Sequence, residues 1–392
     1  MSADRFDVVI IGGGAMGSSV SFFLKHELGF AGSVAVIERD PTFQTASTSL
    51  STSGIRLQFS TPENIRLSAF GVEFLTSLKD RFGPEADAAL KEQGYLILGG
   101  PEARGIIESN VAIQNGEGAG TLLLEPPGLR AQFPWLNLEN VAAASYGPKR
   151  EGWFDAVGVH ATLRRKAKEA GAELLTDEVV AISRAGPTLT GVTLASGRTI
   201  SAGAIVLAAG PRAGRVAKLA GIDLPVEGRK RTAFVVHCRN GPAAMPLLTD
   251  TTGVWIRPEG QYHLCGWSPP EEDDPAADPE DFEPVHSQFE DVIWPALAHR
   301  IPVFEETKVI RAYAGHYDHN KLDQNAIIGR HPEVSNLYFI NGFSGHGVQQ
   351  AAGAGRAVAE LINFGGYRTI DLSVFGFERV LAGKPVLEVN II

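Results

Sequence analysis

Cysteine is nearly absent: the chain of 392 residues contains two, Cys238 and Cys265. Two cysteines cannot form the multiple disulfides of small secreted domains, so we expect free thiols and a reducing compartment. No uninterrupted apolar stretch reaches the roughly 18 residues of a membrane-spanning helix. The first residues lead directly into an apolar strand without a basic segment before it, so we expect no signal peptide. These absences predict a cytoplasmic protein.

Basic residues are fewer than acidic ones, 35 Lys and Arg against 45 Asp and Glu, and the net charge is −10. Eight of the acids lie in residues 271–284, which contain no base, so the rest of the chain is nearly neutral. We predict a solvated surface loop for this acidic run, and a solvated turn for Arg229, Lys230 and Arg231. No clustered basic face is visible, which argues against a nucleic-acid partner.

Glycine is frequent, with 44 residues, but has neither a regular period nor a glycine-rich block. We therefore expect glycines at tight turns and at close approaches of the backbone. The length corresponds to two or three domains of about 150 residues. One glycine cluster follows residues 6–11, FDVVII, a β-branched apolar run typical of a strand that is buried on both faces.

That cluster, residues 12–17, reads GGGAMG and fits the pattern G-x-G-x-x-G. Residues 18–26 predict a helix, and residues 34–37 predict a second strand that ends at Glu38. A glycine-rich turn without a ligand is the alternative interpretation. The strand, helix, second strand and terminal acid all occur in the required order, which favours a dinucleotide site.

Each part of this motif has a chemical role. Gly12 allows the tight turn, Gly14 lets a pyrophosphate approach the backbone, and Gly17 lets the helix pack against the sheet. The N–H groups at the helix start then face the phosphates. Glu38 can accept hydrogen bonds from a ribose diol and would repel a 2′-phosphate.

Residues 41–54 contain eight Ser or Thr residues and favour FAD over NAD. The ribityl chain and ring system of a flavin extend past the first site and need hydroxyl and backbone donors there. A flexible linker is the alternative, but a helix follows closely, with Thr61 as a predicted N-cap and Pro62 at its first position. The loop residues that we expect to contact FAD are Ser47, Thr48, Ser49, Ser53 and Gly54.

The rest of the chain contains two further patterns. Residues 204–209, AIVLAA, predict a buried strand that belongs with the first domain. Residues 226–268 alternate and contain turn sequences, so they predict an antiparallel sheet in a second domain. We assign residues 86–144 to the same second domain.

The C-terminal part has another strand, glycine-rich turn and helix. Residues 337–340 predict the strand, residues 341–347 (NGFSGHG) the turn, and residues 351–362 the helix. A helix dipole at this turn would stabilise the negative charge of a reduced flavin. The residues that we expect to contact the cofactor here are Gly342, Gly345, His346, Gly347, Val348 and Gln349.

Three segments together resemble the D-amino acid oxidase superfamily of FAD enzymes. They are DVVIIGGGAMG with Glu38 in residues 7–38, AIVLAAGP at 204–211, and AIIGRHPEVSNLYFINGFSGHG at 326–347. The chain is most similar to the branch that contains sarcosine oxidase, glycine oxidase and dimethylglycine dehydrogenase. The resemblance covers nearly the whole chain.

The resemblance implies an α/β fold, in which a Rossmann-like FAD-binding domain is interleaved with a second α+β domain whose mostly antiparallel sheet roofs the active site. The expected FAD-binding domain comprises residues 1–85, 145–225 and 312–392. The expected substrate domain comprises residues 86–144 and 226–311. Further cofactor contacts are expected from Ala15, Met16, Arg39, Val179, Ala209 and Gly210.

The resemblance also implies oxidation of the C–N bond of a secondary or N-substituted amino acid, with hydride transfer to flavin N5 and hydrolysis of the imine. The electron acceptor is oxygen or another molecule. A flavin subunit that passes electrons to a partner subunit and a flavin-binding assembly factor without turnover are the alternatives. An NAD-dependent dehydrogenase is disfavoured, because the C-terminal turn would have no role in it.

The chain departs from its relatives where they attach flavin covalently. His316 stands at the position of the sarcosine oxidase cysteine, and the Ser/Thr loop has no counterpart of the dimethylglycine dehydrogenase histidine. We therefore favour non-covalent FAD, with His316 as the alternative attachment site. We predict no metal site, although His316, His319, Asp318 and Asp323 are close in sequence.

The familiar carboxylate anchors are also absent. Gln349 stands at the lysine position of sarcosine oxidase, and Tyr317 at the arginine position of glycine oxidase. Arg56 and Arg257 are then the candidates for a bidentate contact with a substrate carboxylate, assisted by His346. Leu264 falls near the lysine that promotes oxygen reaction in sarcosine oxidase, which favours another electron acceptor. The candidate catalytic residues are Arg56, Arg257, His316, Tyr317, His346 and Gln349.

Overall fold

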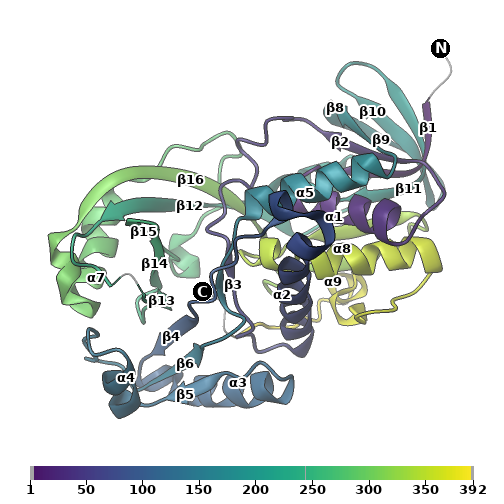
Figure 1. Cartoon of the computed structure of the whole chain (residues 1–392). Helices are drawn as coiled ribbons and strands as arrows, with labels where there is room; N and C mark the ends of the chain where they lie inside the picture. The colour runs from purple at the N-terminus through teal and green to yellow at the C-terminus, as the bar shows by residue number, and fades with distance from the viewer. Residues whose placement is uncertain (1–3, 243, 390–392) are drawn as a thin grey trace.

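The computed structural model describes residues 4–242 and 244–389, and within them the chain forms two eight-stranded sheets and one two-stranded sheet. Figure 1 shows the first sheet and its helices at one side of the molecule and the second sheet at the other. No helix among these residues is long and apolar enough to cross a membrane.

The first sheet has the strand order β17-β18-β11-β1-β2-β8, and β10 and β9 continue from β11 as an antiparallel extension. The path from β18 to β8 is parallel. The strands are β1 (Asp4–Ile11), β2 (Val34–Glu38), β8 (Ala172–Thr176), β9 (Val179–Ala185), β10 (Thr188–Leu194), β11 (Thr199–Leu207), β17 (Ile327–Arg330) and β18 (Leu337–Asn341).

Alternate residues of β1 enter two different cores, as expected for a strand covered on both faces. Val8 and Ile10 pack with the main helices of this domain, whereas Val9 and Ile11 pack beneath β9, β10 and the helix that follows β11. These helices are α1 (Ala15–Phe22), α2 (Pro62–Phe82), α5 (Ala156–Glu169), α6 (Ala213–Lys218), α8 (Gly347–Phe364) and α9 (Glu378–Leu381). The predicted Rossmann-like layer is confirmed.

The second sheet, called the roof sheet below, has the order β16-β12-β15-β14-β13-β4-β6-β5 and is antiparallel except between β13 and β4. Its strands are β4 (Tyr95–Gly99), β5 (Leu122–Leu124), β6 (Ala143–Gly147), β12 (Val226–His237), β13 (Leu247–Thr249), β14 (Val254–Glu259), β15 (Tyr262–Trp267) and β16 (Lys308–Asn320). The remaining helices are α3 (Arg104–Gly116), α4 (Pro126–Gln132) and α7 (Trp294–Arg300).

The roof sheet is formed by two distant parts of the chain. The first part contributes β4, β5 and β6, the second contributes β12 to β16, and the pairing of β4 with β13 joins them. Two of the expected domain boundaries, after residues 144 and 311, fall inside β6 and β16. We propose that the domains divide at the ends of these strands. The two-stranded sheet, β3 (Gly54–Ile55) with β7 (Gly152–Trp153), is the third sheet.

Three local predictions need correction. Arg229, Lys230 and Arg231 are not a solvated turn, because they lie within β12 and pair with β16. The acidic run is not simply solvated, because its carboxylates form ion pairs with Arg212, Lys230 and Arg231. Thr61 is the N-cap residue of α2 as predicted, but its side chain forms no cap bond, and the carboxylate of Glu388 accepts its backbone N–H at 3.2 Å.

Candidate functional site

A cavity of about 1010 Å³ extends from the glycine turn after β1 to the inner face of the roof sheet. Pockets for drug-sized ligands measure roughly 300–1,000 Å³, so this volume suits a dinucleotide with a small molecule beside it. The roof contributes Ile97, Thr249, Trp255 and Trp267 to the lining, and the Ser/Thr loop contributes Leu50. The cavity therefore joins the predicted cofactor site to a partly apolar chamber.

The glycine turn has the backbone geometry of the motif. Gly12 has φ +104°, which favours glycine, and a Cβ at Gly17 would overlap the carbonyl oxygen of Gly12. A Cβ at Gly14 would meet only the Thr48 Oγ1 atom, at 3.4 Å. Gly14 thus borders open space at the start of α1, where a phosphate group would be accepted.

Three side chains fix this turn. Glu38 Oε2 accepts the Gly13 N–H at 2.7 Å, and Thr48 Oγ1 accepts the Ala15 N–H at 2.9 Å. His160 Nε2 lies 2.8 Å from the Gly13 carbonyl oxygen, and burial lowers the pKa of His160 to about 4. His160 is therefore neutral at pH 7 and serves the turn as a hydrogen-bond partner. No motif in the sequence pointed to His160.

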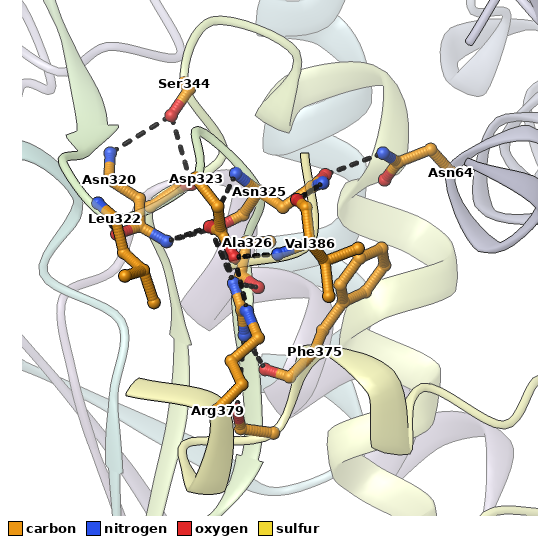
Figure 2. Close-up of polar contacts among 12 residues, drawn as sticks. Asn64, Asn320, Leu322, Asp323, Asn325, Ala326, Ser344, Phe375, Arg379 and Val386 are labelled. Carbon is orange, nitrogen blue, oxygen red and sulfur yellow. Dashed lines mark hydrogen bonds and ion pairs between the residues drawn. The ribbon is translucent and has the colours of Figure 1, made fainter. Parts of the chain in front are cut away.

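A buried polar network supports the second glycine turn, which lies between β18 and α8. Figure 2 shows Ser344, Asn320, Asp323, Asn325 and Arg379 in this network. Ser344 Oγ accepts the Asn320 N–H at 3.0 Å, and Asn320 Nδ2 donates to Asp323 at 2.8 Å. Arg379 completes the network with an ion pair to Asp323 at 2.7 Å. The network connects the turn to the C-terminal segment.

Asp318 is a half-buried carboxylate beside the same turn. It accepts the Gly342 N–H at 2.6 Å, and its own carbonyl accepts the Ser344 N–H at 2.8 Å. Burial raises the pKa of Asp318 to about 6, although the backbone N–H groups of Gly342 and Phe343 oppose the shift. Asp318 lines the cavity, so the charge of its carboxylate changes the electrostatic potential that a ligand bound at this turn would meet.

The structure brings most of the predicted cofactor residues to one cavity. Those that line it are Gly12, Gly14, Ala15, Met16, Glu38, Arg39, Ser47, Thr48, Val179, Ala209, Gly210, Gly345, Gly347 and Val348. Those outside the lining are Gly17, Ser49, Ser53, Gly54, Gly342, His346 and Gln349. Gly17 and Gly342 still shape the two turns, through helix packing and a φ of +77° respectively.

Of the predicted catalytic residues, His316 and Tyr317 line the cavity. The His316 ring stacks on Phe282 at 4.4 Å between centroids, and its Nε2 lies 2.7 Å from the carbonyl oxygen of Asp281. Burial raises the pKa of Tyr317 to about 12, so its phenol is neutral at pH 7.

Arg56 and Gln349 lie together but outside the lining. Gln349 Oε1 accepts the backbone N–H of Arg56 at 2.8 Å, so the residue at the lysine position holds the arginine's main chain. The Arg56 guanidinium lies 4.4 Å from the centre of the Phe59 ring and donates to the Gln58 carbonyl at 3.1 Å. Glu151 supports the same segment, because its carboxylate accepts the Leu57 N–H at 2.8 Å.

Arg257 likewise lies outside the lining. It donates to the Thr52 carbonyl at 3.2 Å, forms an ion pair with Glu259 and lies 5.3 Å from the Trp153 ring. It therefore joins the roof to the Ser/Thr loop. His346 is buried against Phe59, and burial together with the Arg56 charge lowers its pKa to about 3. A neutral His346 cannot supply a cation to a carboxylate.

The sequence reasoning missed Arg231 and Asp274, both of which line the cavity. The two guanidinium nitrogens of Arg231 bind the two carboxylate oxygens of Asp274 at 2.6 and 2.7 Å. Arg231 also donates to the Tyr317 hydroxyl at 2.5 Å. An alternating pattern in residues 226–237 could have placed Arg231 on a strand face, but nothing local pointed to Asp274.

Comparison with known proteins agrees with this geometry. The family described as FAD dependent oxidoreductase matches residues 7–361. The chain belongs to this family. It is 42% identical to FAD-dependent oxidoreductase domain-containing protein 1 of Xenopus laevis, over 99% of this chain and 85% of that protein. It is 24% identical to the sarcosine oxidase subunit beta of an Arthrobacter species, over 91% of this chain and 87% of that subunit.

Among solved structures, the chain is similar to L-proline dehydrogenase from P. horikoshii, with a TM-score of 0.86 and 27% identity over 98% of this chain and 100% of that one. The family assignment confirms FAD as the cofactor and an oxidoreductase as the class of enzyme. The observed cradle fits FAD, since Gly14 leaves open space at the start of α1 and Glu38 lies beside it. Among the described residues, no group of three or more His, Cys, Asp or Glu side chains could hold a metal.

Proposed function

We propose that this flavoenzyme oxidises the C–N bond of a secondary or N-substituted amino acid and that it holds FAD without a covalent bond. The observation that carries the proposal is the continuity of the cavity, which runs from the glycine turns to a chamber lined by Trp255, Trp267 and Ile97. FAD, when bound, supplies a hydride acceptor for a C–H bond next to an amine nitrogen. The imine product then hydrolyses in water.

The chain's own residues position the reactants. The two glycine turns and the starts of α1 and α8 would receive the electron-rich groups of the cofactor. The apolar roof residues Ile97, Trp255 and Trp267 form one wall of the chamber, against which the substrate would lie. His316 lines the cavity as a neutral imidazole that holds the Asp281 carbonyl and Phe282, and not as an attachment point for flavin.

We further propose that the electrons pass to an acceptor other than oxygen. Leu264, near the expected position of an oxygen-activating lysine, is buried in β15. No charged side chain at that position would attract the superoxide that forms when oxygen takes one electron. Reduction of an artificial dye should accordingly exceed peroxide release.

The test is an anaerobic titration of the purified yellow protein with N-methyl and N-carboxyalkyl amino acids. We expect bleaching of the flavin absorption band with at least one of them, and release of the flavin into the supernatant on acid precipitation. A flavin band that no member of the panel bleaches would refute the substrate class. A coloured pellet would refute the non-covalent assignment and return attention to His316.

A further inference from the structure

We propose that the Arg231 guanidinium is the carboxylate-binding group of the roof, and that Asp274 occupies it in the ligand-free protein, so that a ligand carboxylate binds by displacing Asp274. The proposal deepens the proposed function and takes from it the location of the substrate chamber. Residues 268–284, which follow β15 and carry Asp274, are called the strap.

Arg231 is the cation best placed for this role. Among the described residues, the arginines that line the cavity are Arg39, Arg212, Arg215 and Arg231. Arg39 follows β2, and Arg212 and Arg215 follow β11, so these three border the nucleotide end. Arg231 lies on β12 opposite Gly315 of β16, and its side chain keeps 24% of its surface exposed.

The contact with Asp274 has the form that a ligand carboxylate would take. Two parallel N–H···O bonds of 2.6 and 2.7 Å join the planar guanidinium to the planar carboxylate. The same two nitrogens also donate to the Lys230 carbonyl at 3.0 Å and to the Tyr317 hydroxyl at 2.5 Å, and that hydroxyl in turn donates to Asp274 at 3.4 Å. Arg231 therefore remains positioned when its carboxylate partner changes.

Asp274 can be displaced because the strap has other attachments. Ala277 donates its N–H to the Gly228 carbonyl at 2.8 Å, and Asp281 pairs with Lys230 at 2.6 Å. These contacts hold the strap when Asp274 turns away. A ligand carboxylate would keep the Arg231 charge paired, whereas removal of Asp274 alone would leave it unpaired in a partly buried place.

The neighbours favour a small amino acid over a bare anion. The Tyr317 hydroxyl remains neutral and can donate to a second ligand oxygen. Trp255 and Trp267 line the same chamber and can pack against an apolar side chain or ring. A carboxylate on a small apolar body therefore matches both the charge and the shape of the chamber.

The experiment titrates the yellow holoprotein with benzoate and with benzamide, and follows the shift of the flavin absorption band. We expect benzoate to bind the parent protein more tightly than benzamide. Arg231→Gln should weaken benzoate roughly ten- to a hundredfold and leave benzamide unchanged. Asp274→Asn should tighten benzoate by about threefold or more, because the competing charge is gone.

Arg311→Gln is the matched control, since Arg311 lies exposed on β16, opposite Val235 of β12, and neither lines the cavity nor contacts the strap. It should change neither affinity. If Arg231→Gln does not retain flavin, Arg231→Lys replaces it in the test. This variant keeps the positive charge but loses the bidentate geometry, so it should still lower the affinity for benzoate. Two results would overturn the proposal: a benzoate affinity that is unchanged in the Arg231 variants, or a parent protein that does not bind benzoate.

An Asp274→Asn variant that weakens benzoate would also overturn it, because Asp274 would then position Arg231 and not compete with the ligand. Benzoate binding needs no turnover, so this test is separate from that of the proposed function. A protein that binds benzoate through Arg231 but is bleached by no amino acid would refute the substrate class alone.

Discussion

The two ends of the cavity are built by different means. At the nucleotide end, backbone groups of glycine turns and helix starts form the surface, and residues close in sequence supply them, as Gly12, Gly14 and Glu38 do. At the roof end, side chains form the surface, and they meet from distant segments: Arg231 and Asp274 are 43 positions apart. Backbone sites leave a local sequence pattern, whereas side-chain sites of this kind do not.

The difference extends to the supports of each end. The second glycine turn rests on the buried pair Asp323–Arg379, whose side chains are 0% and 6% exposed. The strap rests on pairs such as Arg212–Glu280, in which Glu280 is 68% exposed. Exposed pairs contribute little to stability, whereas breaking a buried pair is costly. The second glycine turn is therefore held by a buried ion pair, whereas the outer part of the strap is held by an exposed one.

The largest expected effect is on the buried pair that supports the second glycine turn. Asp323→Ala should lower the free energy of unfolding by about 3–5 kcal/mol, because Arg379 would be left buried without its partner. Denaturant unfolding followed by circular dichroism measures this. Lys79→Ala, which breaks an exposed pair with Asp87, is the control and should cost far less. Equal costs for the two variants would contradict the contrast between the ends.

Gly14→Val tests the backbone site itself. Its Cβ meets only Thr48 Oγ1, so the protein should fold, but the side chain would occupy the phosphate's approach. We expect FAD affinity to fall by at least about a hundredfold, equivalent to about 2.7 kcal/mol. Flavin content after dialysis measures the loss. Gly105→Val, where a Cβ meets nothing within 4 Å, should keep its flavin.

The sequence predicted the nucleotide end well because its constraints are local. The strand, the glycine spacing and Glu38 lie within residues 6–38, and each is required by the turn or by the ligand. The roof sheet was predictable as a class from alternation and family resemblance. The positions of its side chains were not, because tertiary contacts set them: Arg257 donates to the Thr52 carbonyl, the Arg56 guanidinium donates to the Gln58 carbonyl, and neither residue lines the cavity.

Glu151 offers a pH test of the region between the two ends. Burial raises its pKa from 4.5 to about 7, so the folded protein binds this proton more tightly than the unfolded chain. Its contribution to stability is thus present below about pH 4.5 and is lost as the pH rises through about 7. The Tm of Glu151→Gln minus the Tm of the parent should therefore increase by about 2 °C as the pH is raised from 5 to 8.

Glu117→Gln provides the opposite sign. The hydrogen bond from Arg66 holds the pKa of Glu117 below its usual value, so its contribution is present above the unfolded pKa and is lost as the pH falls. This variant should lose stability relative to the parent at neutral pH and recover the difference in acid. Parallel pH profiles for the two glutamine variants would refute the assignment of a raised pKa to Glu151.

The smallest effect concerns the start of α2, where a local rule and a distant contact disagree. The sequence predicts a Thr61 cap, but Glu388 Oε1 accepts the Ser60 N–H at 2.5 Å and its Oε2 accepts the Thr61 N–H at 3.2 Å. A carboxylate at a helix start contributes about 0.5–2 kcal/mol. Glu388→Gln should therefore cost about 1 kcal/mol, whereas Thr61→Val, which removes the hydroxyl at nearly constant volume, should cost less than about 0.5 kcal/mol. Denaturant midpoints at pH 7 compare the stability of the two variants. A larger loss of stability in Thr61→Val than in Glu388→Gln would show that the Thr61 hydroxyl, and not the distant carboxylate, stabilises the helix start.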